Sequence, residues 1–335
     1  MPNTILQNKD GSFTYNHEDN FTCDNGSILK GFKLTFETHG KKDKPLIIVN
    51  HALSSSYHIA ATELNPQKGW WQNNIGVDKC LNTDKYYILS IGNLGSRLNC
   101  SNAENTKNFP DITINDIAKA QLLLLEALKI NNVNTVIGNS MGGYVSLVLA
   151  MYLGDRLKNL INISSGLKVY PVNKAIHSIQ KEIIMRDPNW ESNRESANIL
   201  IARKLGLLSY FNPSYINDRF KYDSELESYL DYNAKKFLSI TTPRIYVSNL
   251  NTMDEFNLNN YFSSYEQACQ QIKAKCLIIG VTSDTLIPVA QQEELHKFLI
   301  SLNVKSKLQL SNSDKGHDAF YTDEAIAQYV SAQLA

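Results

Sequence analysis

The sequence has few of the features that mark several common classes of protein. Its 335 residues include five cysteines, widely separated and without a Cys-x-x-Cys pair, so neither a disulfide framework nor a zinc knuckle is indicated. Basic and acidic residues number 33 each. This balance indicates no binding surface for nucleic acid or for an anionic membrane. No run of 18 apolar residues occurs, so no membrane-spanning helix is expected.

Signals for export and for metal binding are also missing. The opening MPNTILQNKDGSF lacks the basic stretch and apolar core of a secretory signal. Together with the scattered cysteines, this favours a reduced, cytoplasmic protein. No His-Glu-x-x-His or comparable spacing occurs, so we expect neither a metal site nor a bound cofactor.

Short apolar runs alternate with stretches of helical period along most of the chain. Several runs are apolar at consecutive positions, as in strands buried on both faces. Strands are predicted at 45–50, 86–91, 133–138, 157–164, 276–281 and 307–310. Helices are predicted at 114–130, 141–152, 289–302 and 323–334. The alternation is typical of an α/β protein with a mostly parallel central sheet.

The alternation stops between residues 169 and 273. This stretch has a helical pattern, is rich in tyrosine and asparagine, and contains Pro188, Pro213 and Pro243. The alternation resumes at Cys276. We therefore predict one α/β core formed by residues 1–168 and 274–335, with an inserted helical lid at 169–273.

The strongest local motif is Gly138-Asn139-Ser140-Met141-Gly142, between a predicted strand and a predicted helix. It fits the G-x-S-x-G turn of the α/β-hydrolase fold, which presents a serine nucleophile above the sheet. Glycine is expected at both ends because a Cβ there would collide with the neighbouring chain. The Met141 N–H, at a helix N-terminus, can donate to an oxyanion. The alternative is an ordinary Gly-Ser-rich turn without chemistry.

A serine nucleophile needs a base, and in this fold the acid and then the histidine follow it along the chain. Asp284 directly follows a predicted strand, and His317 precedes the last helix. We predict these as the remaining catalytic residues. Asp314, Asp318 and Asp323 are rival acids but lie too close to His317 in sequence. The other histidines are expected at the surface (His17, His39, His177, His296) or lining the pocket (His51, His58).

The second oxyanion donor is expected on the loop after the first buried strand. The backbone N–H of Leu53 is our candidate, in the segment Asn50-His51-Ala52-Leu53-Ser54. The serines that follow are equally compatible with an ordinary solvated loop.

Strings spread over nearly the whole chain resemble the homoserine O-acyltransferase family of α/β-hydrolase-fold enzymes. They include His51-Ala52-Leu53, Gly69-Trp70-Trp71, Asn93-Leu94-Gly95, Ser140-Met141-Gly142-Gly143, Ala202-Arg203-Lys204-Leu205-Gly206 and Gly316-His317-Asp318-Ala319-Phe320. The resemblance implies transfer of an acyl group, acetyl above all, from the co-substrate acyl-CoA to L-homoserine in methionine biosynthesis. It also implies a ping-pong mechanism and a homodimer packed through the lid.

The resemblance also implies roles for single residues. Ser140 would carry the acyl group, with the Leu53 and Met141 amides holding the oxyanion. Arg203 would bind the α-carboxylate of the acceptor, to which a guanidinium fork is suited. Asp318 would receive the acceptor's α-ammonium. Without the resemblance, Arg203 reads more simply as a solvated cation on an amphipathic helix.

Three departures from the family pattern leave the substrates open. Asn139 stands where the family usually has glycine, and residues 96–108 replace a loop rich in glycine, serine and proline. In that loop, Arg97 could pair with a succinyl carboxylate or could be a surface charge. The acceptor segment of the lid reads Thr242-Pro243-Arg244 in place of the family string. The alternatives are therefore a succinyl donor, L-serine as acceptor, a small-ester serine hydrolase and a catalytically idle relative.

Overall fold

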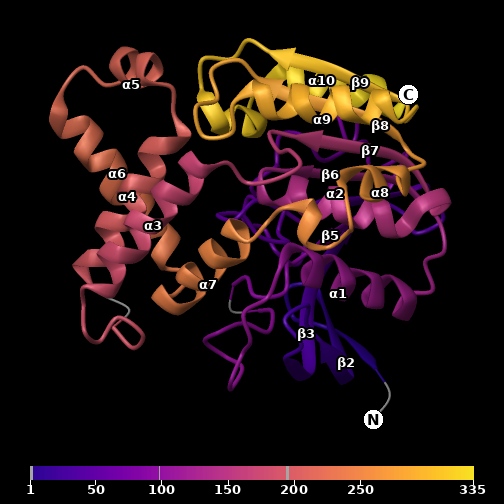
Figure 1. Cartoon of the computed structure of the whole chain (residues 1–335), viewed down its shortest axis with the longest axis horizontal. Coiled ribbons are helices and arrows are strands. Elements are labelled where there is room, and N and C mark those ends of the chain that lie inside the picture. The colour runs from indigo at the N-terminus through magenta and orange to yellow at the C-terminus, as the bar shows by residue number, and fades with distance from the viewer. Residues whose placement is uncertain (1–2, 98, 194–195) are drawn as a thin grey trace.

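The computed structural model describes residues 3–97, 99–193 and 196–335, which form a nine-stranded sheet flanked by helices (Figure 1). The strand order is β1-β2-β3-β5-β4-β6-β7-β8-β9. From β5 to β9 in this order the neighbours are parallel, while β1, β2 and β3 add an antiparallel edge. The predicted mostly parallel sheet is confirmed. The parallel strands are β4 (Leu46–Asn50), β5 (Tyr87–Ile91), β6 (Val133–Asn139), β7 (Leu157–Ile163), β8 (Lys275–Val281) and β9 (Ser306–Ser311).

The antiparallel edge of the sheet was not predicted from the sequence. It consists of β1 (Thr4–Gln7), β2 (Phe13–Thr22) and β3 (Ile28–His39). These strands carry many polar and exposed residues, so they lack the consecutive apolar positions that identify the central strands. The end of β3 pairs with β5, placing Phe36 opposite Ile91.

Two apolar cores lie on opposite faces of the sheet because successive side chains of a strand alternate between faces. Ile48 of β4 belongs to one core, with residues of α1, α2 and α9, whereas Ile47 and Val49 belong to the other, with residues of α10. The helix bounds are α1 (Ile114–Ala127), α2 (Met141–Leu153), α9 (Val289–Ser301) and α10 (Glu324–Leu334). A short 3-10 helix, η1 (Gly154–Arg156), precedes β7.

Helix α1 begins as predicted at Ile114, where Thr113 and Asp116 form a capping box. It ends three residues earlier than predicted, because the chain turns at Lys129 with a positive φ of 57°.

Between β7 and β8 the chain forms a group of helices that lies beside the sheet in Figure 1. Pro213 and Pro243 are the first residues of two of them, which fits the preference of proline for the first helical turn. The helices share their own apolar contacts, among them Ile199, Phe237 and Tyr246. Their bounds are α3 (Pro171–Met185), α4 (Ala197–Tyr210), α5 (Pro213–Arg219), α6 (Asp223–Leu238) and α7 (Pro243–Asp254).

The last part of the inserted stretch returns to the sheet. It contains η2 (Leu258–Asn260) and α8 (Tyr265–Gln270). Phe256, Leu258 and Cys269 are buried in the same core as α1 and α2. In the described structure, then, the helices standing away from the sheet are α3 to α7.

Candidate active site

Ser140 stands at the turn between β6 and α2. Its φ is 53°, a positive value that is strained for a residue with a side chain, and its side chain is only 5% exposed. A Cβ on Gly138 would lie 2.0 Å from the Gly142 carbonyl oxygen, and one on Gly142 would lie 2.2 Å from the Asn50 carbonyl oxygen. The expectation that both positions require glycine is confirmed.

Asn139, the departure from the family pattern, is the last residue of β6 and lies opposite Ile163 of β7. Its side chain is buried, and its amide nitrogen has no hydrogen-bond partner among the described residues. A buried amide nitrogen without a partner is energetically unfavourable.

His317 and Asp284 lie together although 33 residues separate them. His317 is in the 3-10 helix η3 (Gly316–Tyr321), and Asp284 follows β8. The distance between His317 Nδ1 and Asp284 Oδ2 is 2.7 Å. The other oxygen of Asp284 accepts hydrogen bonds from the backbone N–H groups of Leu286 and Ile287. Both carboxylate oxygens therefore take part in hydrogen bonds. Asp284 fixes the orientation of the imidazole, with Nε2 on the side away from Asp284.

The charge of Asp284 governs the acid–base behaviour of His317. Burial by itself lowers the pKa of the imidazole, but the charge of Asp284 and its hydrogen bond outweigh this and raise the pKa above its ordinary value. A raised pKa suits a residue that must accept a proton near neutral pH.

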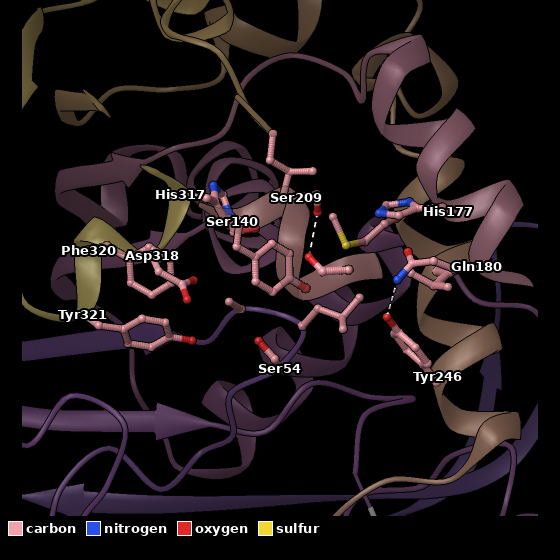
Figure 2. A pocket seen from close by; sticks show the side chains of 17 residues that line it. Ser54, Ser140, His177, Gln180, Ser209, Tyr246, His317, Asp318, Phe320 and Tyr321 are labelled. Carbon is pink, nitrogen blue, oxygen red and sulfur yellow. Dashed lines mark hydrogen bonds between the residues drawn. The ribbon is translucent and has the colours of Figure 1, made fainter. Parts of the chain in front are cut away.

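Ser140 and His317 line the same small inner cavity (Figure 2). No hydrogen bond joins their side chains among the described residues, an arrangement that is common in ligand-free active sites. The free space in this cavity is about 30 Å³, which is enough to admit a water molecule. The structure thus brings Ser140, His317 and Asp284 to one place, and their catalytic roles stay a prediction.

The two candidate oxyanion donors are Leu53 and Met141, the residue after Ser140. Leu53 lines the inner cavity, and Met141 is the first residue of α2. Among the described residues, neither backbone N–H donates a hydrogen bond to a protein acceptor. Both are available to a ligand oxygen, as an oxyanion hole requires.

A larger outer cavity of about 930 Å³ adjoins the inner one. The two share four lining residues, which are Ser54, Tyr210, Asp318 and Tyr321. The outer cavity has room for a sizeable ligand, and the inner one holds the reactive groups.

Arg203, on α4, lines the outer cavity and is only 3% exposed. The alternative of a solvated cation is therefore wrong. Its Nη1 donates to the Tyr210 hydroxyl at 2.9 Å, and its guanidinium carbon lies 4.1 Å from the centre of the Phe237 ring. Burial by itself would lower the pKa of Arg203, but Tyr210 and Tyr246 outweigh burial, so the pKa is raised above its ordinary value. Its Nε has no hydrogen-bond partner among the described residues.

Asp318 lines both cavities, and its carboxylate faces the cavity in Figure 2. Burial raises its pKa to about 6, against the opposing influence of His317 and Arg203. Among the described residues Asp318 takes part in no ion pair. Arg203 and Asp318 thus present opposite charges to one space without neutralising each other through direct contact.

Sequence reasoning missed the contribution of α3 and α7 to the inner cavity. His177, expected at the surface, is buried and lines this cavity, with Nδ1 2.6 Å from Asp254. Gln180 donates to the Tyr246 hydroxyl at 2.7 Å, also at the cavity (Figure 2). His17, likewise expected at the surface, is buried against Phe32. The sequence pattern around an isolated polar residue on a helix does not indicate whether that residue faces a cavity or solvent.

The described residues contain no group of three or more His, Cys, Asp or Glu side chains that could hold a metal ion. In the same part of the chain no helix is long and apolar enough to cross a membrane.

The comparisons with known proteins agree with the fold. A family model described as alpha/beta hydrolase fold matches residues 45–324. The fold and the serine–histidine–aspartate arrangement thus define a protein of the α/β-hydrolase class.

Two curated relatives indicate which family within this class the chain belongs to. A homoserine O-acetyltransferase of Methanosphaera stadtmanae is 30% identical over 94% of this chain and 71% of its own length. A serine O-succinyltransferase of Xanthomonas campestris pv. campestris is 30% identical over 90% of this chain and 91% of its own length. The chain belongs to the homoserine O-acyltransferase family of α/β-hydrolase-fold enzymes.

Solved structures show the same fold. A homoserine O-acetyltransferase from Bacillus anthracis has a TM-score of 0.87 at 18% identity, covering 96% of this chain and 97% of its own. Esterase E22 has a TM-score of 0.86 at 23% identity, covering 99% of this chain and all of its own.

Proposed function

We propose that the protein transfers an acyl group from acyl-CoA to the side-chain hydroxyl of L-homoserine, through an acyl-serine at Ser140. Relatives named homoserine O-acetyltransferase support the acceptor, and methionine biosynthesis is the pathway in which we place it. Acyl-CoA acts as a co-substrate, and the proposed mechanism requires no bound cofactor.

In the first half-reaction the Ser140 hydroxyl attacks the thioester carbonyl while its proton passes to His317 Nε2. Asp284 stabilises the imidazolium, and the N–H groups of Leu53 and Met141 hold the oxyanion. The carbon–sulfur bond then breaks, and the thiolate takes the proton from His317 to leave as CoA.

In the second half-reaction the acceptor hydroxyl gives its proton to His317, and its oxygen attacks the acyl-serine. The tetrahedral intermediate uses the same two N–H groups. Ser140 then leaves with the proton from His317, and the product is the O-acyl amino acid.

One observation supports the choice of acceptor: a buried cation, Arg203, and a half-buried carboxylate, Asp318, face one cavity without pairing. A free amino acid presents the complementary pair, a carboxylate and an ammonium group. Charged hydrogen bonds of this kind contribute about 1.5–3 kcal/mol each. Binding the acceptor would neutralise both side chains at once.

Acceptor-dependent release of CoA tests the proposal. We expect release with homoserine to be much faster than release without it, and parallel lines in double-reciprocal plots. Ser140→Ala should lower turnover by several orders of magnitude. Equal rates with and without any amino acid would instead identify a hydrolase that uses water as acceptor.

The variant Arg203→Ala separates the two halves of the reaction. Formation of the acyl-serine, followed by intact mass, should stay close to native. The kcat/KM for the acceptor should fall about 10- to 100-fold, as for a lost charged hydrogen bond. Arg203→Lys, which keeps the charge but loses the planar fork, should lie in between. Loss of Ser140 acylation in either variant would contradict the role given to Arg203.

L-serine is the second candidate acceptor, since a relative is named serine O-succinyltransferase. The two amino acids share the carboxylate and ammonium groups and differ by one methylene, a difference worth about 1–3 kcal/mol in a fitted pocket. The ratio of kcat/KM for homoserine and serine decides between them.

A homodimer packed through the lid completes the proposal. Five large apolar side chains on α3 and α4 are 40–52% exposed, which supports an interface there. They are Val172, Ile179, Met185, Ile201 and Leu208. We place the enzyme in the cytoplasm, in keeping with five free cysteines.

A further inference from the structure

A second guanidinium lines the outer cavity. Arg97, on the loop after β5, is mostly buried and lines this cavity together with Arg203 and Asp318. One of its terminal nitrogens donates to the carbonyl oxygen of Ser54, and its Nε is buried without a hydrogen-bond partner. Among the described residues no carboxylate forms an ion pair with it. The neighbouring Leu98 lies outside the described residues.

The lack of a counter-charge is energetically unfavourable. Burial lowers the pKa of Arg97 to about 10, with Arg203 acting in the same direction and Tyr321 and Tyr57 acting against it. The side chain nevertheless remains charged at neutral pH. A cation withdrawn from water without an anionic partner destabilises the protein unless a ligand supplies that partner.

The acceptor alone does not supply it. A zwitterionic amino acid places its carboxylate at Arg203 and its ammonium group at Asp318, which leaves Arg97 unmatched. Of the two guanidinium groups that line the cavity, one therefore has no anionic partner when this acceptor is bound. The other substrate can supply an additional anionic group.

The position of Arg97 shows which part of the donor it can meet. The carbonyl to which it donates belongs to Ser54, the residue after Leu53, whose N–H is the candidate donor to the acyl oxygen. Ser54 lines both cavities. The guanidinium is thus anchored one residue from the place where the acyl carbonyl is held. An acetyl group ends one bond beyond the carbonyl carbon, whereas succinyl carries a carboxylate three carbon–carbon bonds away.

We propose that Arg97 binds the distal carboxylate of a dicarboxylic acyl group of succinyl type, so that the enzyme prefers this donor to the acetyl donor implied by the family resemblance. The proposal rests on the acyl-serine mechanism above and adds the class of the acyl group. A guanidinium matches a planar carboxylate through two parallel hydrogen bonds.

The competing explanation is that Arg97 merely anchors the loop through Ser54. The two roles differ in their consequences, because a loop anchor serves every donor equally and a carboxylate site serves only one. Arg97→Gln separates them, since an amide can still donate to the Ser54 carbonyl but has no charge.

The experiment compares succinyl-CoA with acetyl-CoA, and 4-nitrophenyl succinate with 4-nitrophenyl acetate. The aryl esters present the same acyl groups without CoA. Native enzyme should acylate Ser140 from the succinyl donors at least about 10-fold faster in kcat/KM, the effect expected of one charged hydrogen bond. Arg97→Gln should lose about 10- to 100-fold with succinyl and little with acetyl. Lys236→Gln, which removes an exposed cation of the same cavity, should leave the succinyl-to-acetyl ratio unchanged.

The outcomes separate this inference from the proposed function. A native preference for acetyl, or an equal loss of both donors in Arg97→Gln, would overturn the carboxylate site while leaving acyl transfer intact. A succinyl preference followed only by hydrolysis would support Arg97 and overturn the proposed acceptor step. Absence of any adduct on Ser140 from all four donors would overturn both.

Discussion

Burial changes the acid–base behaviour of single residues around Ser140. It raises the pKa of Asp318 to about 6 and lowers the pKa of His51 to about 4, because a low-dielectric environment disfavours the charged form of each. At neutral pH Asp318 is therefore ionised and His51 is uncharged. Each consequence can be tested by substitution.

Asp318→Asn should make the protein more stable at neutral pH but a poorer catalyst. The folded pKa of Asp318 lies above its ordinary value of 3.8, so its stabilising contribution is complete below that value and is lost as the pH rises through about 6. Removing the charge should raise the free energy of unfolding at neutral pH by roughly 1–3 kcal/mol. Denaturant unfolding at neutral pH and near pH 4 measures this difference.

The same variant should lower kcat/KM for the amino-acid acceptor about 10- to 100-fold, since it removes the partner of the ammonium group. Asp314→Asn, at an exposed position two residues before η3, is the matched control and should change neither quantity. Unchanged acceptor kinetics in Asp318→Asn would contradict the assigned role.

His51 should position the oxyanion donor Leu53. Its Nδ1 donates to the Ala52 carbonyl oxygen at 2.8 Å, and its Nε2 accepts from the Asn93 N–H at 3.1 Å. That carbonyl and the Leu53 N–H belong to one trans peptide and point in opposite directions, so fixing one fixes the other. His51→Phe should lower kcat about 10- to 100-fold with little change in KM, less than the loss of a whole oxyanion donor.

A rescue variant distinguishes this role from simple packing. His51→Asn retains an amide donor and should recover part of the lost kcat. Equal losses of kcat in both variants would argue for packing alone.

The native enzyme should also lose stability as the pH falls from about 6.5 towards 4. The reason is that the unfolded chain binds a proton at His51, whereas the folded protein keeps this residue uncharged until a lower pH.

Among the secondary-structure elements, the central strands and their helices follow from local sequence, whereas the lid depends on contacts between helices. Strands such as β4 and β8 are apolar at nearly every position, which marks burial on both faces. Helices α3 and α7 are linked by a polar cluster in which Asp254 bonds both His177 and Lys181. These residues give no periodic signal, so the cluster could not be predicted.

Asp254→Ala should destabilise the lid. The pKa of Asp254 is lowered: burial alone would raise it, but His177 and Lys181 outweigh burial, so its stabilising contribution is present at neutral pH and is lost as the pH falls through the lowered value. We expect a loss of about 1–3 kcal/mol in unfolding free energy and faster amide exchange in α3 and α7. Glu182→Gln, which breaks the exposed pair with Arg186 on the same helix, should have little effect.

At the scale of the whole molecule, the candidate active site lies at the junction between the sheet and the lid. The turn after β6, the loops after β4 and β8, and η3 supply the candidate reactive groups, and α3, α4 and α7 supply the opposite wall. A dimer formed through the outer face of α3 and α4 would stabilise this wall of the cavity.

Charged substitutions on that face should break the proposed homodimer. Ile179→Asp combined with Ile201→Asp places charges on two exposed positions of α3 and α4 and should shift the mass in solution from dimer to monomer. Ile28→Asp, equally exposed at the start of β3, should leave the mass unchanged. Light scattering after size exclusion measures the result, and a native monomer would contradict the assembly.

The sequence by itself determined the parallel sheet, the flanking helices, the glycine-bounded turn at Ser140 and the order of serine, aspartate and histidine. These are set by short-range patterns of burial and backbone geometry. Only the tertiary structure decided that Asp284 faces His317, that Arg203 is buried beside Asp318, and that Arg97 enters the same cavity without a counter-charge. These contacts depend on which distant segments of the chain pack together and on which charged groups are removed from solvent. Neither can be predicted from a local sequence pattern.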